Sequence, residues 1–425
     1  MVSGTVATAI NAVVMVIAYP VYLHFLGYEK YGVWLILATV LTFAQLGNLG
    51  ISSAVMKLVA EEHGRGNTKG IQSYVTTSLA ILLFSGTIAL ILILLLRNQI
   101  ISAFKLSGQN AVIASQLLPY IAFLSICVML VQVLNSTISG LGRMDIANYI
   151  LSGGRVVTVG TSSILLWLGN GIESLLIGNT LSYIFVGGAS VFFMRKTINI
   201  RLLQISNFDR RSFHRLMHFG GGVFSGSLAS MFLHPFNKLM LSRYAGVSSI
   251  PIYEIAFTGS MQVRGLAEVG LKALMPEISR IGANMTRYAK DRISQINHHA
   301  MKLIFLFGIP VYAGLIILLT PLLKFWLRQR FVDELPVAFR IMLVSTFLSL
   351  LGVPAYYTLL GLGMVRHTLI AHIILSGVSA LIILTIVFIW HNISVATVSW
   401  AILTATAVTS LYLNWTNKRK ALKSG

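Results

Sequence analysis

The chain has 425 residues, of which 56% are hydrophobic and only 10% are charged, and its formal net charge is +20. Soluble domains contain roughly 25% charged residues, so this composition excludes a soluble globular protein and favours a protein embedded in a membrane. With a single cysteine, Cys127, the chain cannot form an intrachain disulfide.

Apolar stretches long enough to cross a bilayer recur along the whole sequence, since a membrane-spanning helix needs about 20 mainly apolar residues. The twelve expected helices lie at about 4–26, 33–56, 73–96, 114–138, 147–168, 174–194, 218–244, 250–276, 301–322, 337–361, 368–390 and 393–415. We expect no cleavable signal peptide, because the first stretch is too long and lacks a basic flank. The sequence therefore predicts an all-α polytopic membrane protein.

The longest polar break in the sequence spans 197–217 and separates six expected helices from six more. Its many basic residues are typical of a loop on the cytoplasmic face. We therefore expect three parts, namely an N-terminal six-helix bundle at 1–196, a cytoplasmic linker at 197–217 and a C-terminal six-helix bundle at 218–425.

The two predicted bundles carry similar short motifs in the same order. Each motif of the second half follows its counterpart at a nearly constant offset of about 220 residues, as expected of an internal repeat. The matching motifs are Gly27, Gly32 and Trp34 with Gly246, Pro251 and Tyr253; 48–51 with 268–271; and 137–142 with 358–363. Six helices per half is an even number, so both halves enter the membrane in the same direction. The sequence thus predicts two pseudo-symmetric six-helix bundles around a central cavity, an architecture typical of alternating-access transporters.

The positive charge is concentrated in the loops on one side of the expected membrane. If both termini are cytoplasmic, most of the 32 Lys and Arg residues fall in cytoplasmic loops and few fall in outer loops. This asymmetry obeys the positive-inside rule and assigns both termini to the cytoplasm. Basic loops of this kind contact anionic lipids, so the charge does not indicate a nucleic-acid partner.

The expected helix at 250–276 carries the densest set of charges inside the membrane. Arg264, Glu268 and Lys272 are spaced four residues apart and therefore share one helical face. An ionisable side chain at the bilayer centre costs about 2.5–3.5 kcal/mol, so this face must contact water, a ligand or another helix. We interpret the two cations as candidate substrate-binding residues. The alternative is an Arg264–Glu268 pair that neutralises itself and packs inside the bundle.

Two further cations, Lys238 and Arg155, extend the same candidate site. For each of them the alternative is a side chain that snorkels toward the membrane interface. Together with the two cations of the helix at 250–276 they outnumber Glu268, while Glu254 lies near the expected outer mouth. A cavity with this excess of positive charge suits an anionic substrate, in particular one that carries phosphate groups.

No arrangement of residues in the sequence indicates catalysis, a metal site or a bound cofactor. His234 and His372 are isolated, and no nucleophile–base pair, phosphate-binding loop or dinucleotide motif is visible. Neutral polar residues such as Asn48 and Gln132 are more typical of hydrogen bonds between helices than of ligand binding. The sequence therefore does not predict an enzyme.

Three groups of segments carry a likeness to a known family. They are 22–34 (YLHFLGYEKYGVW) with 46–51 (LGNLGI), 252–256 (IYEIA) with 274–279 (LMPEIS), and 354–357 (PAYY) with 361–363 (GLG). In these segments the chain resembles Wzx-type polysaccharide and O-antigen flippases. These flippases belong to the polysaccharide transporter family of the superfamily that also contains multidrug exporters. The likeness spans nearly the whole chain, and its motifs are short and mostly structural.

The resemblance implies a multi-pass protein of the bacterial inner membrane that moves an undecaprenyl-diphosphate-linked oligosaccharide from the cytoplasmic to the periplasmic leaflet. It also implies that the diphosphate and sugar bind in a cationic cavity while the lipid tail stays in the bilayer. The candidates for that cavity, chosen by depth and charge, are Arg264, Lys272, Lys238 and Arg155. We expect a proton or sodium gradient to drive the cycle, with Glu268 or Glu254 binding the ion or balancing charge. We expect no other cofactor.

The expected partners are the lipid-linked oligosaccharide, membrane lipids and a polysaccharide polymerase complex. One alternative is an ion-coupled multidrug exporter of the same superfamily, for which acidic residues would have to dominate the cavity. A membrane-embedded polymerase or glycosyltransferase would need a large outer loop, and a scaffold protein would not need charges at bilayer depth. Residues 1–4 lack the basic segment with which many family members begin, so an upstream native start is one interpretation.

Overall fold

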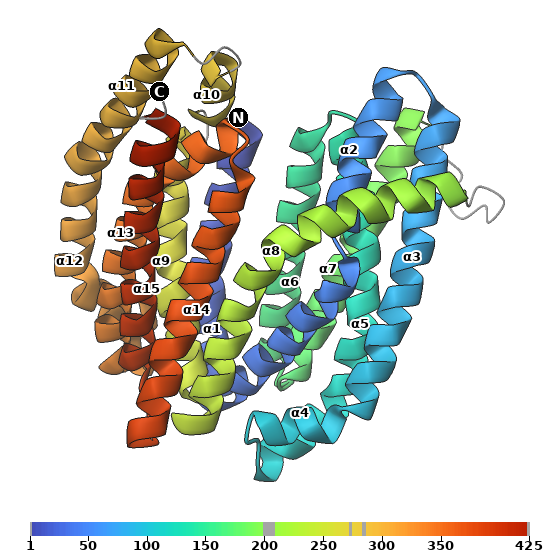
Figure 1. The fold of residues 1–425 in the computed structure, drawn as a ribbon. Helices are drawn as coiled ribbons and strands as arrows, with labels where there is room; N and C mark the ends of the chain where they lie inside the picture. Colours follow the sequence, from blue (N-terminus) through green and yellow to red (C-terminus); the bar gives the residue numbers. More distant parts are fainter. Residues whose placement is uncertain (1, 199–208, 272–273, 283–285, 423–425) are drawn as a thin grey trace. The chain divides into compact units, whose positions relative to one another are not determined.

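The computed structural model describes residues 2–198, 209–271, 274–282 and 286–422, which are almost entirely helical (Figure 1). The chain divides into two compact units, Met1–Gly226 and Ser227–Gly425. The boundary falls inside one long helix, α8 (Arg210–Tyr244). Residues 210–217 of the expected linker thus form the first turns of α8, while 199–208 lie outside the described residues.

The first unit, hereafter unit 1, is built from α1 to α7 and the first half of α8. Its helices are α1 (Val2–Ala44), a 3-10 turn (Gln45–Asn48), α2 (Ile51–Gly64), α3 (Thr68–Leu95), α4 (Arg97–Ala103), α5 (Gly108–Gly140), α6 (Met144–Trp167) and α7 (Glu173–Ile198). The short α4 lies crosswise at the ends of α3 and α5 (Figure 1). The main packed pairs are α6 with α7 and α3 with α5.

The second unit, hereafter unit 2, contains the rest of α8 and seven further α-helices. These are α9 (Ser249–Leu271), α10 (Leu274–Gly282), α11 (Arg287–Leu303), α12 (Ile309–Leu327), α13 (Glu334–Gly361), α14 (Val365–Trp390) and α15 (Val395–Thr416). A π-helical segment, Ile304–Gly308, joins α11 to α12. The core of unit 2 forms around α13, which packs against both α15 and α9.

Nine helices of the described residues are long and apolar enough to cross a membrane, so the protein is an all-helical polytopic membrane protein. This number differs from the twelve expected for two physical reasons. The expected helix at 4–26 and the first part of the one at 33–56 count as a single element, α1, although two helices meet there across a kink at Gly27, with φ 68° and ψ 178°. In addition, charged and polar residues interrupt the apolar stretches of α8 and α9, which are not among the nine.

The internal repeat is visible in the backbone. Gly27 and its counterpart Gly246 both have positive φ, 68° and 91°, and so do Gly142 and Gly363, with 80° and 74°. Left-handed geometry of this kind favours glycine, which lacks a Cβ. The repeat motifs therefore fix the same two chain reversals in each unit.

The repeat also extends to side-by-side packing within each unit. A Cβ on Gly140 would lie 2.6 Å from the Met56 carbonyl oxygen, and a Cβ on Gly361 would lie 3.1 Å from the Met275 carbonyl oxygen. Met56 and Met275 occupy equivalent places, because each precedes its partner glycine by nearly the same number of residues. Glycine at these positions lets two helices approach closely, as is common among membrane helices.

Candidate functional site

Unit 2 contains a cavity of about 480 Å³ among α8, α9, α13, α14 and α15. Apolar and small polar side chains form most of its wall. Four ionisable side chains line it, namely His234, Arg264, Glu268 and His372, together with the hydroxyls of Tyr356 and Tyr357. The cavity is therefore a polar chamber inside an otherwise apolar helical unit.

Arg264 and Glu268 form an ion pair in this chamber. Their closest atoms, Arg264 Nη2 and Glu268 Oε2, are 3.4 Å apart, and their side chains are 25% and 20% exposed. The Tyr357 hydroxyl, from α13, donates a hydrogen bond of 2.7 Å to the other carboxylate oxygen of Glu268. Arg264 Nε is buried and has no hydrogen-bond partner among the described residues. The arginine thus keeps donor capacity for a further acceptor.

A second ion pair lies beside the chamber. Lys238 Nζ, from α8, is 2.8 Å from Glu254 Oε2, from α9, and the two side chains are only 11% and 22% exposed. The Thr258 hydroxyl donates to the other oxygen of Glu254 at 3.3 Å. Neither Lys238 nor Glu254 lines the chamber, whereas His234, one helical turn before Lys238, does. The positive charge of Lys238 is therefore balanced locally by Glu254.

A buried tyrosine ties α8 to α9 next to this pair. The fully buried Tyr253 hydroxyl accepts a hydrogen bond from Asn237 Nδ2 at 3.1 Å and lies 3.0 Å from His234 Nδ1. Tyr253 is the counterpart of Trp34 in the repeat. These contacts hold the helix faces that carry Lys238 and Glu254 in a fixed register.

Unit 1 contains its own polar cavity, of about 570 Å³. Its wall combines the aromatic rings of Tyr19, Tyr22, Tyr31 and Trp34 with polar side chains from α5, α6 and α7. Arg155, near the middle of α6, is the cation on this wall. No described carboxylate lies within 4.0 Å of Arg155. Unit 1 thus holds an unbalanced cation in a polar, aromatic cavity.

An amide side chain, Asn48, occupies the place in unit 1 where unit 2 has Glu268. Asn48, the counterpart of Glu268, donates hydrogen bonds of 2.8 Å to Ser52 Oγ and to Gln132 Oε1. Gln132 in turn donates to Gln45 Oε1 at 3.2 Å. The prediction of hydrogen bonds between helices for Asn48 and Gln132 is therefore confirmed, and Gln132 and Gln45 also line the cavity.

The predicted site residues fall into two separate sets. Arg264 and Glu268 lie together in the chamber of unit 2, with the Lys238–Glu254 pair beside it. Arg155 belongs to the cavity of unit 1. Lys272 lies outside the described residues.

Tyr357 is the residue of the chamber that the sequence did not single out. Its contact with Glu268 depends on how α13 packs against α9, and no local sequence pattern encodes that packing. The only available signal was its place in the segment 354–357, which was noted for its family likeness and not for chemistry. His234 and His372, which are isolated in the sequence, both line the chamber.

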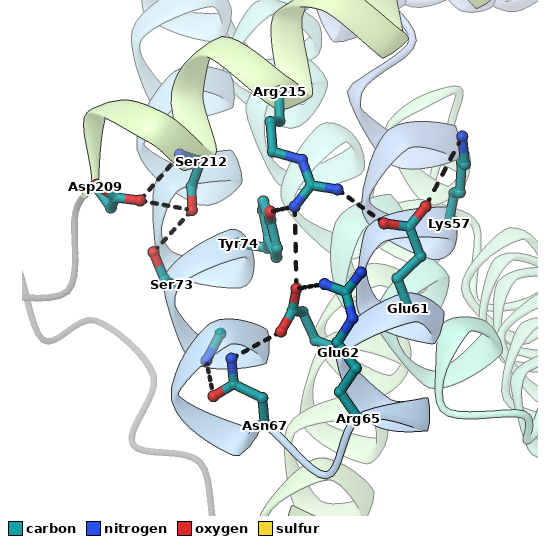
Figure 2. Close-up of polar contacts among 11 residues, drawn as sticks. Lys57, Glu61, Glu62, Arg65, Asn67, Ser73, Tyr74, Asp209, Ser212 and Arg215 are labelled. Carbon is teal, nitrogen blue, oxygen red and sulfur yellow. Dashed lines mark hydrogen bonds and ion pairs between the residues drawn. The ribbon is translucent and has the colours of Figure 1, made fainter.

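A further polar cluster, in unit 1, joins the start of α8 to α2 and α3 (Figure 2). Arg215 donates hydrogen bonds to the Tyr74 hydroxyl at 2.6 Å and to Glu61 Oε2 at 2.8 Å. The buried Glu62 accepts from Arg65 and from Asn67 at 3.0 and 2.7 Å. This cluster anchors the first turns of α8 to unit 1.

The first residues of α8 are capped by the same cluster (Figure 2). The carboxylate of Asp209 accepts hydrogen bonds from the backbone N–H groups of Arg211 and Ser212, and these bonds lower its pKa. The Ser212 hydroxyl also lies 3.0 Å from Ser73 Oγ of α3.

In the part of the chain that the structure describes, no group of three or more His, Cys, Asp or Glu side chains could hold a metal ion.

Solved structures share this fold over almost the whole chain. The inward-facing structure of a multidrug resistance MATE family transporter of the MOP superfamily superposes with a TM-score of 0.76 at 16% identity, covering 99% of this chain and 96% of the other. A MOP superfamily transporter from Pyrococcus furiosus, described as having a binding pocket of reversed polarity, gives 0.60 at 16% identity over 99% and 97%. The protein is thus a multi-pass membrane protein with the fold of the MOP superfamily.

The sequence itself matches a more specific group. The family of polysaccharide biosynthesis proteins matches residues 1–282, more than half of the chain, and the chain belongs to that family. A Shigella flexneri protein named "Putative O-antigen transporter" is 21% identical over 356 residues, which cover 82% of this chain and 80% of that protein. The resemblance to Wzx-type proteins in the sequence is thereby confirmed.

Proposed function

We propose that this protein is a flippase that moves an undecaprenyl-diphosphate-linked oligosaccharide, such as an O-antigen unit, from the cytoplasmic to the periplasmic leaflet of a bacterial inner membrane. Three findings support this proposal: the family of polysaccharide biosynthesis proteins, the MOP superfamily fold and the name of the Shigella flexneri relative. We further propose that both termini are cytoplasmic, because that orientation obeys the positive-inside rule.

The observation that carries the proposal is the environment of Arg155. It lies near the middle of a helix that is long enough to span a membrane, and no described carboxylate within 4.0 Å balances it. A cation at such depth is costly unless a ligand or water stabilises it. A diphosphate supplies that countercharge through charge-assisted hydrogen bonds. The aromatic rings of Tyr22 and Trp34 in the same cavity offer flat apolar surface of the kind that packs against sugar rings.

The chamber of unit 2 has a complementary role in this proposal. Arg264 retains an unpartnered Nε, so it can donate a hydrogen bond to a phosphate oxygen while it stays paired with Glu268. Alternating access requires that an ion or substrate change the relative stability of two conformations. Glu268 and Glu254, each paired with one cation, are the groups whose protonation or sodium binding would release that cation for the substrate.

The second candidate function is an ion-coupled multidrug exporter, which the likeness to MATE transporters favours. That likeness is at 16% identity and therefore concerns the fold. Cationic drugs would require an acidic cavity, whereas the cavity of unit 1 contains Arg155 and no described carboxylate on its wall. The positive charge of this cavity therefore matches the anionic substrate of a flippase better than a cationic drug.

The proposal is tested by complementation of a bacterial strain that lacks its surface polysaccharide flippase, using the matched variants Arg155→Ala and Arg155→Lys. We expect alanine to abolish surface polysaccharide and lysine to retain part of it, since lysine keeps the charge but loses the planar donor set. Membrane abundance of each variant is measured in parallel. Full export by an equally abundant Arg155→Ala variant would contradict the assigned site, and failure of the unmodified protein to restore any polysaccharide would contradict the function.

A further inference from the structure

A second hollow in unit 2 runs along α11 and shares no lining residue with the polar chamber. It is a groove of about 610 Å³ between α11 with its π-helical extension on one side and α9 and α10 on the other, with Leu350 of α13 at its base. Most of its wall is apolar. The proposed function does not yet assign any role to this groove.

The wall formed by α11 changes in polarity along its length. Arg292, Gln295 and His299 line one end of the groove, and Leu303 and Phe307 line the other. These residues are three or four positions apart, so they follow one another along one face of the helix. At about 1.5 Å per residue, the stretch from Arg292 to Phe307 is about 22 Å long. The groove therefore has a polar, basic head and a long apolar body, the polarity profile of an amphiphile.

The basic end is available for an anion. Arg292 is exposed and forms no ion pair within 4.0 Å with a described carboxylate, although Glu277 of α10 interacts with its charge at longer range. His299 Nδ1 lies 2.8 Å from the backbone carbonyl oxygen of Gln295, so this nitrogen carries the proton of the neutral ring. The exposed guanidinium of Arg292 complements a phosphate or diphosphate better than a neutral headgroup.

The opposite wall combines two small residues with Leu271 and Leu274. Ala267 and Gly270 of α9 line it, and a Cβ placed on Gly270 would meet nothing within 4 Å. On the α11 side, three lining residues come from the π-helical segment Ile304–Gly308. π-Helical turns are rare and occur frequently at functional sites.

We propose that this groove binds the polyprenyl diphosphate carrier of the lipid-linked substrate. Before it reaches Arg155, the diphosphate lies at Arg292 beside His299, and the isoprenoid chain follows the apolar wall toward Phe307. This inference rests on the proposed function and adds to it a place where the lipid portion is held apart from the polar cavities. A carrier with one long chain can follow the single apolar face of α11 and its π-helical extension, whereas a diacyl phospholipid must place two chains.

The test is photolabelling of the purified full-length protein in nanodiscs with a diazirine-bearing polyprenyl diphosphate. Cross-linked peptides are mapped by mass spectrometry. A diazirine-bearing phosphatidylglycerol serves as the comparison lipid. We expect the diphosphate probe to label 292–307 preferentially, and unlabelled polyprenyl diphosphate to compete with it.

Two variants and one matched control make the test specific. Gly270→Leu fills the groove, and Arg292→Ala removes the cation at its head. Gly314→Leu, in α12, is the control, because a Cβ there also meets nothing within 4 Å and Gly314 does not line the groove. We expect each of the two groove variants to lower labelling by about tenfold, the effect of losing one charge-assisted hydrogen bond or the chain contact. The control should label as the unmodified protein does.

Equal labelling by both lipids, with no effect of Gly270→Leu, would mean that ordinary membrane lipid fills the groove, and the inference would be overturned. Leaflet transfer of the lipid-linked substrate is measured on the same samples. Normal transfer without specific labelling refutes the groove alone. Specific labelling without any transfer by the unmodified protein refutes the proposed function and leaves the groove as a lipid-binding site.

Discussion

Lys238 and Glu254 form an ion pair of 2.8 Å that joins α8 to α9 inside unit 2. Both side chains are largely buried, and the Thr258 hydroxyl donates a hydrogen bond to the other carboxylate oxygen of Glu254. Lys238, which the sequence places among the candidate substrate-binding cations, is thus paired with a carboxylate. A buried pair of this kind is expensive to break, since removal of one partner leaves an uncompensated charge.

We therefore expect Glu254→Gln to destabilise unit 2 by about 3–5 kcal/mol. The double variant Lys238→Met with Glu254→Gln should recover most of that loss, because it removes both charges together. The measurement is thermal unfolding of the detergent-purified protein, followed by intrinsic fluorescence, as a double-mutant cycle. If the stability lost in the double variant equals the sum of the losses in Lys238→Met and Glu254→Gln measured singly, the two residues are not coupled.

The Tyr357 hydroxyl orients Glu268 in the chamber of unit 2. Tyr357→Phe removes a hydrogen bond to a charged group, which is worth about 1.5–3 kcal/mol. Glu268 should then hold Arg264 less precisely, and we expect surface polysaccharide export to fall about tenfold. Export is measured by complementation at matched protein abundance.

The matched control is Tyr356→Phe. Tyr356 is the neighbouring residue and lines the same chamber, and its ring contacts are those with Tyr357 and His372. Removal of its hydroxyl should leave export nearly unchanged. If both variants reduce export equally, the effect belongs to the aromatic wall of the chamber and not to the hydrogen bond with Glu268.

The features that could be predicted from sequence are those encoded locally. Hydrophobic length predicts the helices, and the paired glycines Gly27 and Gly246 predict the repeated chain reversal, because positive φ favours glycine whatever surrounds it. The spacing of Arg264 and Glu268 predicts their shared helical face. Each of these depends on residues close together in the chain.

The pairing of charges could not be predicted in the same way. Whether Glu254 balances Lys238 depends on the packing of α8 against α9, and the contact of Tyr357 with Glu268 depends on α13 packing against α9. The polar cluster around Arg215 likewise joins residues more than a hundred positions apart. Composition and hydrophobic periodicity do not show which residues far apart in the sequence come into contact.

The Arg215 cluster of unit 1 offers a test of how α8 is anchored (Figure 2). Arg215 is 44% exposed, so solvent screens its pair with Glu61 and the expected coupling energy is about 1 kcal/mol or less. Arg215→Glu should destabilise the protein, since it places a third carboxylate beside Glu61 and Glu62. The exchange Arg215→Glu with Glu61→Arg should restore part of the loss. The midpoint of thermal unfolding is compared at low and high salt, and a salt-independent difference would contradict an electrostatic origin.

The repeated glycines Gly140 and Gly361 provide a matched pair of substitutions, because each packs against the backbone of an equivalent methionine. An added Cβ would lie 2.6 Å from the Met56 carbonyl oxygen in unit 1 but 3.1 Å from the Met275 carbonyl oxygen in unit 2. The first distance requires the helices to separate, whereas the second needs only a few tenths of an ångström. We therefore expect Gly140→Ala to cost about 1–3 kcal/mol, as in other overpacked interiors, and Gly361→Ala clearly less. The stability of both variants is measured by thermal unfolding. An equal loss of stability at the two sites would contradict this expectation, because it would mean that atomic movement around Gly140 relieves its closer contact.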